Sequence, residues 1–177
     1  MPRTRQIPDN YIFEIVRRLL IAGGERAVTF AAVAKKSGLS GPSLVQRYQS
    51  RESMLLQAHL AGWDALDIVT DSAILRAPDS AKGISALLKD LAPSDFALPA
   101  TDLTGLLRYL DDQALRLRAL AWRERVVSAI TERMGSKDRE GAEIVFAAWQ
   151  GRLLWTRAGA EAFRLRDLQR RLGKSQT

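Results

Sequence analysis

The side chains of this sequence that could do chemistry are suited to binding rather than to catalysis. The 177 residues include no Cys and a single His, His59. This inventory excludes a redox dithiol, a thiolate zinc site, a His-rich metal cluster and any mechanism that needs two imidazoles. The adjacent acids Asp111 and Asp112 read as a helix cap, because no base or nucleophile stands at a useful spacing from them. We therefore predict no enzyme activity, no metal and no cofactor.

A different kind of chemistry is concentrated between residues 46 and 51. The amide of Gln46 can pair bidentately with adenine, and the guanidinium groups of Arg47 and Arg51 can neutralise phosphates. The surrounding segment is basic: residues 1–52 hold nine Lys and Arg against four Asp and Glu, a net charge of +5 out of +7 for the whole chain. This distribution favours a polyanionic partner, nucleic acid first and an anionic membrane surface second. Charge alone fits equally well with a role in solubility.

The elements that position these side chains are expected to be helices throughout. Apolar residues recur at helical spacing, and no sustained alternation typical of strands occurs. The first helix would be capped by Asp9 or Asn10 and would end at Gly23-Gly24. We predict an all-α chain of about nine helices, at residues 10–23, 30–36, 41–48, 50–75, 80–91, 102–110, 112–134, 138–157 and 161–172, with a short Pro-bounded piece at residues 94–97.

The second and third of these helices form a helix-turn-helix. Thr29 and Ser40 are placed to cap them, and Gly38 supplies the backbone freedom of the turn between them. A helical projection puts Leu44 and Tyr48 on one face of the third helix, and it puts Pro42, Gln46 and Gln49 on the opposite face, with Ser43 and Val45 flanking. The second face is predicted to stay exposed and to enter the DNA major groove.

The stretch from Thr29 to Leu55 (TFAAVAKKSGLSGPSLVQRYQSRESML) resembles the DNA-binding signature of TetR-type transcriptional regulators. The resemblance covers about residues 10–60, and beyond them it depends on helix number and length. It departs from the family pattern where Val45 replaces a Tyr that contacts phosphate and thymine methyl, where Arg47 replaces a His, and where Tyr48 and Arg51 replace Phe and Lys. The expected DNA-binding residues are Thr29, Gly41, Pro42, Ser43, Val45, Gln46, Arg47, Tyr48 and Arg51.

The resemblance implies a two-domain regulator. Residues 1–52 would bind DNA, and residues 53–177 would form a larger helical domain for ligand binding and dimerisation. The implied partners are a palindromic double-stranded DNA operator, a second copy of the chain and a small apolar or aromatic effector. The effector pocket is expected, by this analogy and from the aromatic content, to involve Trp63, Tyr109, Trp122, Phe146 and Trp149. The plainer interpretation of these rings is that they fill the core.

The helix at residues 138–157 has apolar side chains on two opposite faces. One face carries Ala142, Phe146, Trp149 and Leu153, and the other carries Ile144, Ala148, Gly151 and Trp155. A helix that is apolar on two sides must be covered on both. Another helix, such as 112–134, or a second copy of the chain could cover the second face. We expect a homodimer interface at Ile144, Ala148, Gly151 and Trp155.

Two further expectations concern location and the competing function. No apolar run approaches the roughly 18–20 residues of a membrane span, and no secretory leader is apparent, so a cytoplasmic protein without membrane contact is expected. The competing function is a helical protein–protein adaptor whose basic N-terminal segment has no DNA specificity.

Overall fold

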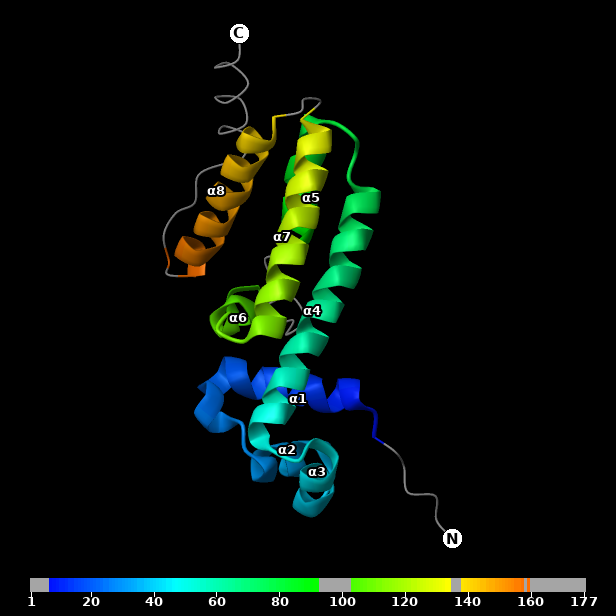
Figure 1. The fold of residues 1–177 in the computed structure, drawn as a ribbon, viewed down its shortest axis with the longest axis vertical. Coiled ribbons are helices and arrows are strands. Elements are labelled where there is room, and N and C mark those ends of the chain that lie inside the picture. The colour runs from blue at the N-terminus through cyan, green and yellow to red at the C-terminus, as the bar shows by residue number, and fades with distance from the viewer. Residues whose placement is uncertain (1–6, 93–102, 135–137, 158, 160–177) are drawn as a thin grey trace. The chain divides into compact units, whose positions relative to one another are not determined.

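The computed structural model describes residues 7–92, 103–134, 138–157 and 159. All regular structure in these ranges is helical, as predicted (Figure 1). The predicted Pro-bounded piece at residues 94–97 and the predicted helix at residues 161–172 lie outside the described residues. In chain order the elements are α1 (Asp9–Gly23), η1 (Glu25–Ala27), α2 (Phe30–Ser37), α3 (Gly41–Tyr48), α4 (Arg51–Arg76), α5 (Ala81–Asp90), α6 (Leu103–Leu106), η3 (Leu107–Tyr109), α7 (Gln113–Arg133) and α8 (Arg139–Arg157).

The chain divides into two compact units. The first comprises the described residues up to Leu66 together with those from 103 to Leu115, and the second comprises those from Asp67 to 92 and from Arg116 onward. Helix α4 runs from the first unit into the second. These units reflect packing, whereas the predicted division after residue 52 separates functions and stays a prediction.

The first unit is built around the apolar side of α1. Ile12, Ile15, Val16 and Leu19 form a buried stripe along α1, and Leu44 and Tyr48 of α3 are buried as well. Burial of such aliphatic side chains contributes roughly 1.5–3 kcal/mol each. The short helices α2 and α3 are therefore fixed through a few large contacts to α1.

The ends of α2 and α3 follow the predicted capping. The hydroxyl of Thr29 accepts a hydrogen bond from the amide of Ala32 at 3.1 Å, and the hydroxyl of Ser40 accepts one from the amide of Ser43 at 3.1 Å. Gly38 adopts a left-handed conformation with φ +77°, which ends α2 and begins the turn. The helix-turn-helix geometry is thus specified by residues close together in sequence.

The predicted cap of α1 is wrong. The N-cap residue is Pro8, neither Asp9 nor Asn10, and no side chain caps the helix. The carboxylate of Asp9 instead accepts a hydrogen bond from the distant hydroxyl of Tyr48. A long-range partner has replaced the local one.

The segment predicted as a helix at residues 102–110 is shorter and tighter than expected. One α-helical turn, α6, is followed by the 3-10 turn η3. At the end of η3, the ring centroid of Tyr109 lies 3.8 Å from that of His59 on α4. Asp112 then caps α7 as predicted, because its carboxylate accepts from the amide of Leu115 at 3.0 Å.

The second unit has a core that contains two tryptophans whose indole N–H groups are hydrogen-bonded. The indole N–H of Trp122 donates to the hydroxyl of Thr70 at 2.8 Å, and that of Trp149 donates to the carbonyl of Leu88 at 3.0 Å. The ring of Phe146 lies within 6 Å of both indoles, at 5.9 and 5.8 Å between centroids. Such packing binds α4, α5, α7 and α8 together.

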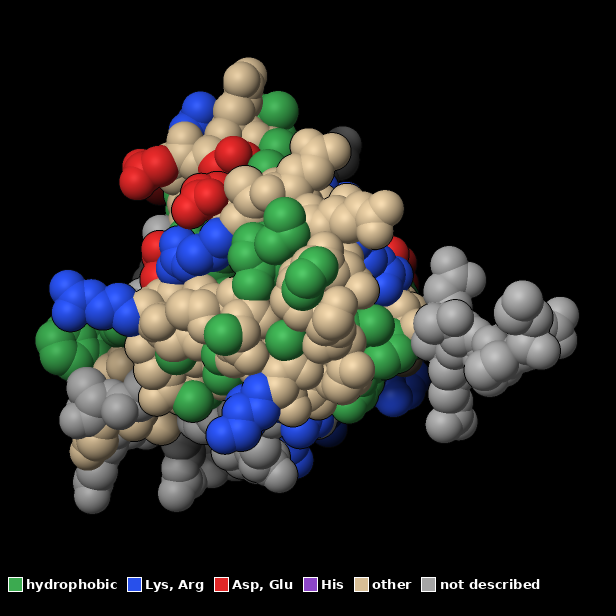
Figure 2. Space-filling model, turned by 90° about the horizontal axis from the view of Figure 1, so that it is seen from below, with side chains coloured by type: hydrophobic (Ala, Val, Ile, Leu, Met, Phe, Trp, Pro, Cys, Tyr) green, Lys and Arg blue, Asp and Glu red, His purple; other side chains and the backbone are tan. Residues whose placement is uncertain are grey.

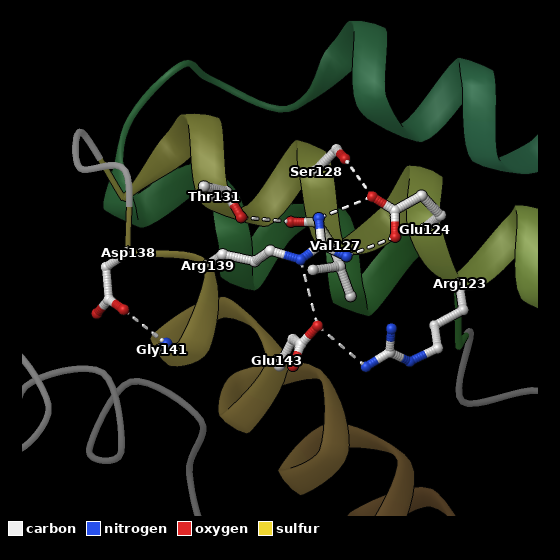
Figure 3. Close-up of polar contacts among 9 residues, drawn as sticks. All are labelled: Arg123, Glu124, Val127, Ser128, Thr131, Asp138, Arg139, Gly141 and Glu143. Atoms are coloured by element: carbon white, nitrogen blue, oxygen red, sulfur yellow. Dashed lines mark hydrogen bonds and ion pairs between the residues drawn. The ribbon is translucent and has the colours of Figure 1, made fainter.

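Ion pairs hold the start of α8 against α7 (Figure 3). The guanidinium of Arg139 donates two hydrogen bonds to the carboxylate of Glu124, at 2.5 and 2.7 Å. Glu143 accepts from the same guanidinium at 3.3 Å and lies 3.5 Å from Arg123 of α7. The hydrogen bonds from Arg139 lower the pKa of Glu124. The charges alternate through four side chains, so each carboxylate contacts a cation.

A buried histidine lies where α1, α4 and η3 meet in the first unit. His59 is 4% exposed, and its Nε2 has no hydrogen-bond partner among the described residues. Arg17 of α1 donates to the carbonyl of Ala58 at 3.2 Å. Burial lowers the pKa of His59 to about 4, and the positive charge of Arg17 acts in the same direction. The imidazole is therefore neutral in the folded protein at neutral pH.

This burial predicts a loss of stability in mild acid. In the unfolded chain His59 takes up a proton near pH 6.5, whereas the folded protein resists protonation until about pH 4. The contribution of the neutral His59 to the free energy of unfolding is therefore complete above pH 6.5. It is lost as the pH falls towards 4, by at most about 1.4 kcal/mol per pH unit. Urea denaturation at a series of pH values should show this slope, and His59→Gln should reduce it. Equal slopes for both proteins between pH 6.5 and 5 would contradict the assignment.

Candidate nucleic-acid interface

Helix α3 presents one exposed face, as the sequence predicted. Leu44 and Tyr48 are buried beneath the helix, at 0% and 2% exposure. The opposite side is exposed and carries Pro42, Ser43, Val45, Gln46 and Gln49. Figure 2 looks onto the end of the first unit that carries α2 and α3; most of the Asp and Glu side chains visible there gather at its upper left, and Lys and Arg side chains are spread around the rest.

Helix α2 adds exposed hydroxyl and cationic side chains. Thr29, Lys35 and Lys36 are all exposed. Neither lysine forms an ion pair with another described residue, so both charges face solvent. The sequence prediction did not include these lysines, although their position in the basic segment was a signal that could have identified them.

The predicted phosphate ligand Arg47 is turned back toward α1. Its Nε lies 2.8 Å from the carboxylate of Asp9, and its Nη1 donates to the carbonyl of Ile7 at 2.7 Å. Its guanidinium also lies over the ring of Tyr48, 5.7 Å from the centroid. Two of its three nitrogens are therefore engaged within the protein, which the sequence pattern did not reveal.

Arg51 has a similar internal position at the start of α4. Its Nε donates to the carbonyl of Val28 at 2.7 Å, and its Nη2 donates to the carbonyl of Glu25 at 2.5 Å. Its guanidinium also pairs with the carboxylates of Glu25 and Glu52, at 3.8 and 3.5 Å. Arg51 thereby connects the start of α4 to η1 and to Val28, the residue that follows η1.

Tyr48, which was predicted at the interface, lies beneath it. Its hydroxyl donates to Asp9 at 2.5 Å, and its ring packs against Phe13 with centroids 5.8 Å apart. Burial and this bond raise the pKa of Tyr48. Burial would raise the pKa of Asp9, but hydrogen bonds from Tyr48 and Arg47 and the charge of Arg47 outweigh it and lower that pKa. The three side chains form a polar link, which we call the Asp9 link, between the start of α1 and the end of α3.

A tight turn joins α3 to α4. Gln49 has a positive φ of 65°, and the amide of Ser50 donates to the carbonyl of Tyr48 at 2.7 Å. A non-glycine residue in this conformation is strained by about 1–3 kcal/mol. The hydroxyl of Ser50 accepts from the amide of Ser53 at 3.0 Å, so the next helix begins at once. The turn fixes the end of the exposed face.

The two apolar faces of α8 have different surroundings. Ala142, Phe146 and Trp149 of the first face are buried. On the predicted dimer face Ala148 and Gly151 are half-buried, whereas Ile144 and Trp155 are 43% and 61% exposed. The neighbouring Leu154, which the projection did not assign to that face, is also exposed. An apolar surface of this kind typically marks an interaction site.

The residues predicted to line an effector pocket are divided between the units. Trp63 and Tyr109 belong to the first unit, and Trp122, Phe146 and Trp149 belong to the second. The three tryptophans and Phe146 are at most 2% exposed, and Tyr109 is half-buried. They pack as core side chains of their own units, and an effector site stays a prediction. In the described part of the chain, no cluster of three potential metal ligands occurs and no helix has the length and hydropathy of a membrane span.

Comparison with known proteins identifies the fold. No family model and no curated protein matches the sequence. Among solved structures, the TetR family transcriptional regulator PfmR from Thermus thermophilus is similar, with 19% identity over 91% of this chain and 93% of that one and a TM-score of 0.58. A TetR/AcrR family transcriptional regulator from Aquifex aeolicus matches with 14% identity over 95% and 97% and a TM-score of 0.60. The chain has the fold of these regulators over more than nine-tenths of its length.

The Asp9 link predicts a specific loss of stability. Asp9→Ala leaves the buried hydroxyl of Tyr48 without an acceptor and Arg47 without its carboxylate, so it should lower the free energy of unfolding by about 1–3 kcal/mol in urea denaturation. Glu14→Ala, which removes an exposed ion pair with Arg18 on the same helix, is the matched control and should change it by less than about 0.5 kcal/mol. Similar losses in both variants would show that the link is not a stabilising contact.

Proposed function

We propose that this protein is a sequence-specific DNA-binding transcriptional regulator that binds a palindromic operator as a homodimer. The observation that carries the proposal is the exposed side of α3, held out on a capped helix-turn-helix. The likeness of the fold to solved transcriptional regulators supports it. The regulator acts as a repressor that responds to a small molecule, as the resemblance in the sequence implies.

The geometry of α3 suits insertion into the major groove. A helix fits that groove, and the exposed Pro42, Ser43, Val45 and Gln46 would reach base edges from it, with Gly41 allowing a close approach. The amino ends of α2 and α3, at Thr29 and Ser40, are exposed and suit phosphate oxygens.

Cationic side chains would supply the phosphate contacts around that groove. Lys35 and Lys36 lie on α2, the helix that crosses the backbone in this motif. Arg47 and Arg51 are partly exposed, at 28% and 31% of their side chains. In this proposal both arginines mainly stabilise the helix-turn-helix, and the exposed part of each side chain contacts phosphates.

The exposed face of α8 supports the homodimer. A second copy with two-fold symmetry would cover Ile144, Leu154 and Trp155 with the same residues of its own α8. The same symmetry would place two copies of α3 on two half-sites, so that the operator would be an inverted repeat.

A small apolar or aromatic effector completes the proposed regulator. The rings that would contact it, such as Trp63 or Trp122, are closely packed in their units. Binding therefore requires local rearrangement, and it would be detected as a rise in melting temperature together with weaker operator binding. The adaptor alternative predicts binding to acidic proteins with no preference among duplexes.

The division between base and phosphate contacts can be tested by substitution. Gln46→Ala should relax preference at one operator position, with a loss of about 1–3 kcal/mol on the selected operator and little change on random duplex. Lys35→Ala should weaken binding to the operator and to random duplex alike, and it should reduce the slope of log affinity against log salt concentration by about one. Fluorescence anisotropy with labelled duplexes at several salt concentrations measures both. Equal losses on both duplexes for Gln46→Ala would remove α3 from base recognition.

The homodimer can be tested at Trp155. Trp155→Glu places a charge on the exposed face of α8, so sedimentation should show a monomer, and its far-UV circular dichroism should match that of the wild type. Leu75→Glu is the matched control, because Leu75 is 87% exposed on α4 of the same unit and lies outside the proposed interface. A Trp155→Glu protein that sediments like the wild type would place the interface elsewhere.

A further inference from the structure

We infer that the bases read by α3 are A·T pairs, through the methyl group of thymine and the N6/N7 edge of adenine. The inference rests on the proposed function and goes beyond it by naming the class of operator sequence. It comes from comparing the exposed face of α3 with the side chains that each base requires in the major groove.

Helix α3 lacks a cationic side chain positioned to read guanine. Guanine is normally read by Arg or Lys, which donate to its O6 and N7 acceptors. The only basic residue of α3 is Arg47. Its Nε and Nη1 are held by Asp9 and by the carbonyl of Ile7, at 2.8 and 2.7 Å. Asp9 is itself held by the hydroxyl of Tyr48, so the guanidinium is fixed away from the exposed face.

Cytosine also has no acidic reader on α3. The amino group of cytosine is recognised by Asp or Glu. The sequence of α3, GPSLVQRY, contains no acidic residue. Helix α3 therefore has no charged side chain available to recognise either base of a G·C pair.

The exposed side chains of α3 match the other two bases. Val45 is 46% exposed and offers methyl groups suited to the C5-methyl of thymine, and the ring of Pro42 is exposed on the same helix. Gln46 is exposed and carries the amide that pairs bidentately with adenine. Ser43 can serve any base, but its hydroxyl already lies 2.7 Å from that of Ser40.

The cations outside α3 do not change this conclusion. Arg51 lies at the start of α4 with Nε and Nη2 bonded to the carbonyls of Val28 and Glu25. Lys35 and Lys36 belong to α2, the helix of this motif that crosses the phosphate backbone. Their charges supply affinity without sequence information.

The test begins by selecting binding sites for the full-length protein from random duplexes. Within the selected half-site, each thymine is then replaced by uracil, which removes only the methyl group, and each adenine by 7-deazaadenine, which removes only the N7 acceptor. One uracil should weaken wild-type binding about three- to fivefold, as expected for the loss of one methyl contact. One 7-deazaadenine should weaken it about tenfold.

Variants assign these effects to their side chains. Val45→Ala shortens the apolar side chain and should reduce the difference in affinity between thymine and uracil duplexes. Gln46→Ala should bind adenine and 7-deazaadenine duplexes equally. Lys35→Ala is the control and should keep both preferences while binding more weakly. Because Val45 and Gln46 are exposed, the variants should keep the wild-type melting temperature, which is measured alongside.

The outcomes separate this inference from the proposed function. Failure to enrich any sequence would overturn the regulator proposal itself. Enrichment of half-sites with G·C pairs at the positions contacted by α3 would overturn the inference and leave the regulator standing. Enrichment of A·T pairs whose binding is insensitive to uracil and to Val45→Ala would also overturn it, since the selection would then depend on DNA shape.

Discussion

The carboxylate of Asp9 is the contact on which the helix-turn-helix of this protein depends. It accepts a hydrogen bond from the hydroxyl of Tyr48 at 2.5 Å and forms an ion pair with Arg47 at 2.8 Å. These contacts join the first turn of α1 to the last turn of α3. Helix α3 has only eight residues and one buried side, so apolar packing alone constrains its rotation weakly. Charged hydrogen bonds are directional, and they add that constraint.

The Asp9 link also determines which chemistry reaches solvent. By holding Arg47 against α1, it leaves an outward face without charge on a helix that would approach a highly charged polymer. In the proposed regulator, attraction to DNA would then depend on cations elsewhere, such as Lys35 and Lys36, and discrimination between sequences would depend on the neutral side chains of α3. The proposal thereby assigns affinity and specificity to different helices, because phosphate contacts supply affinity without sequence information.

In the second unit a different constraint acts on α8. Its inner face packs Phe146 and Trp149 into the core, and Arg139 fixes its first turn to Glu124 of α7. The exposed Ile144 and Trp155 are therefore carried on a helix that is anchored along its other side. A rigid apolar surface needs less ordering on association than a mobile one, which supports the proposed interface between copies.

The sequence by itself determined the features that depend on near neighbours. Helix capping acts over three or four residues, so Thr29, Gly38 and Ser40 were sufficient to predict the helix-turn-helix. Helical periodicity was sufficient to predict the solvent-exposed side of α3 and the second apolar face of α8. Only the tertiary structure decided the partners of the polar side chains. Tyr48 reaches Asp9 across 39 residues, and Arg47 reaches Ile7 across 40. Long flexible side chains select among many polar groups according to which ones folding brings near, and no local pattern records that choice.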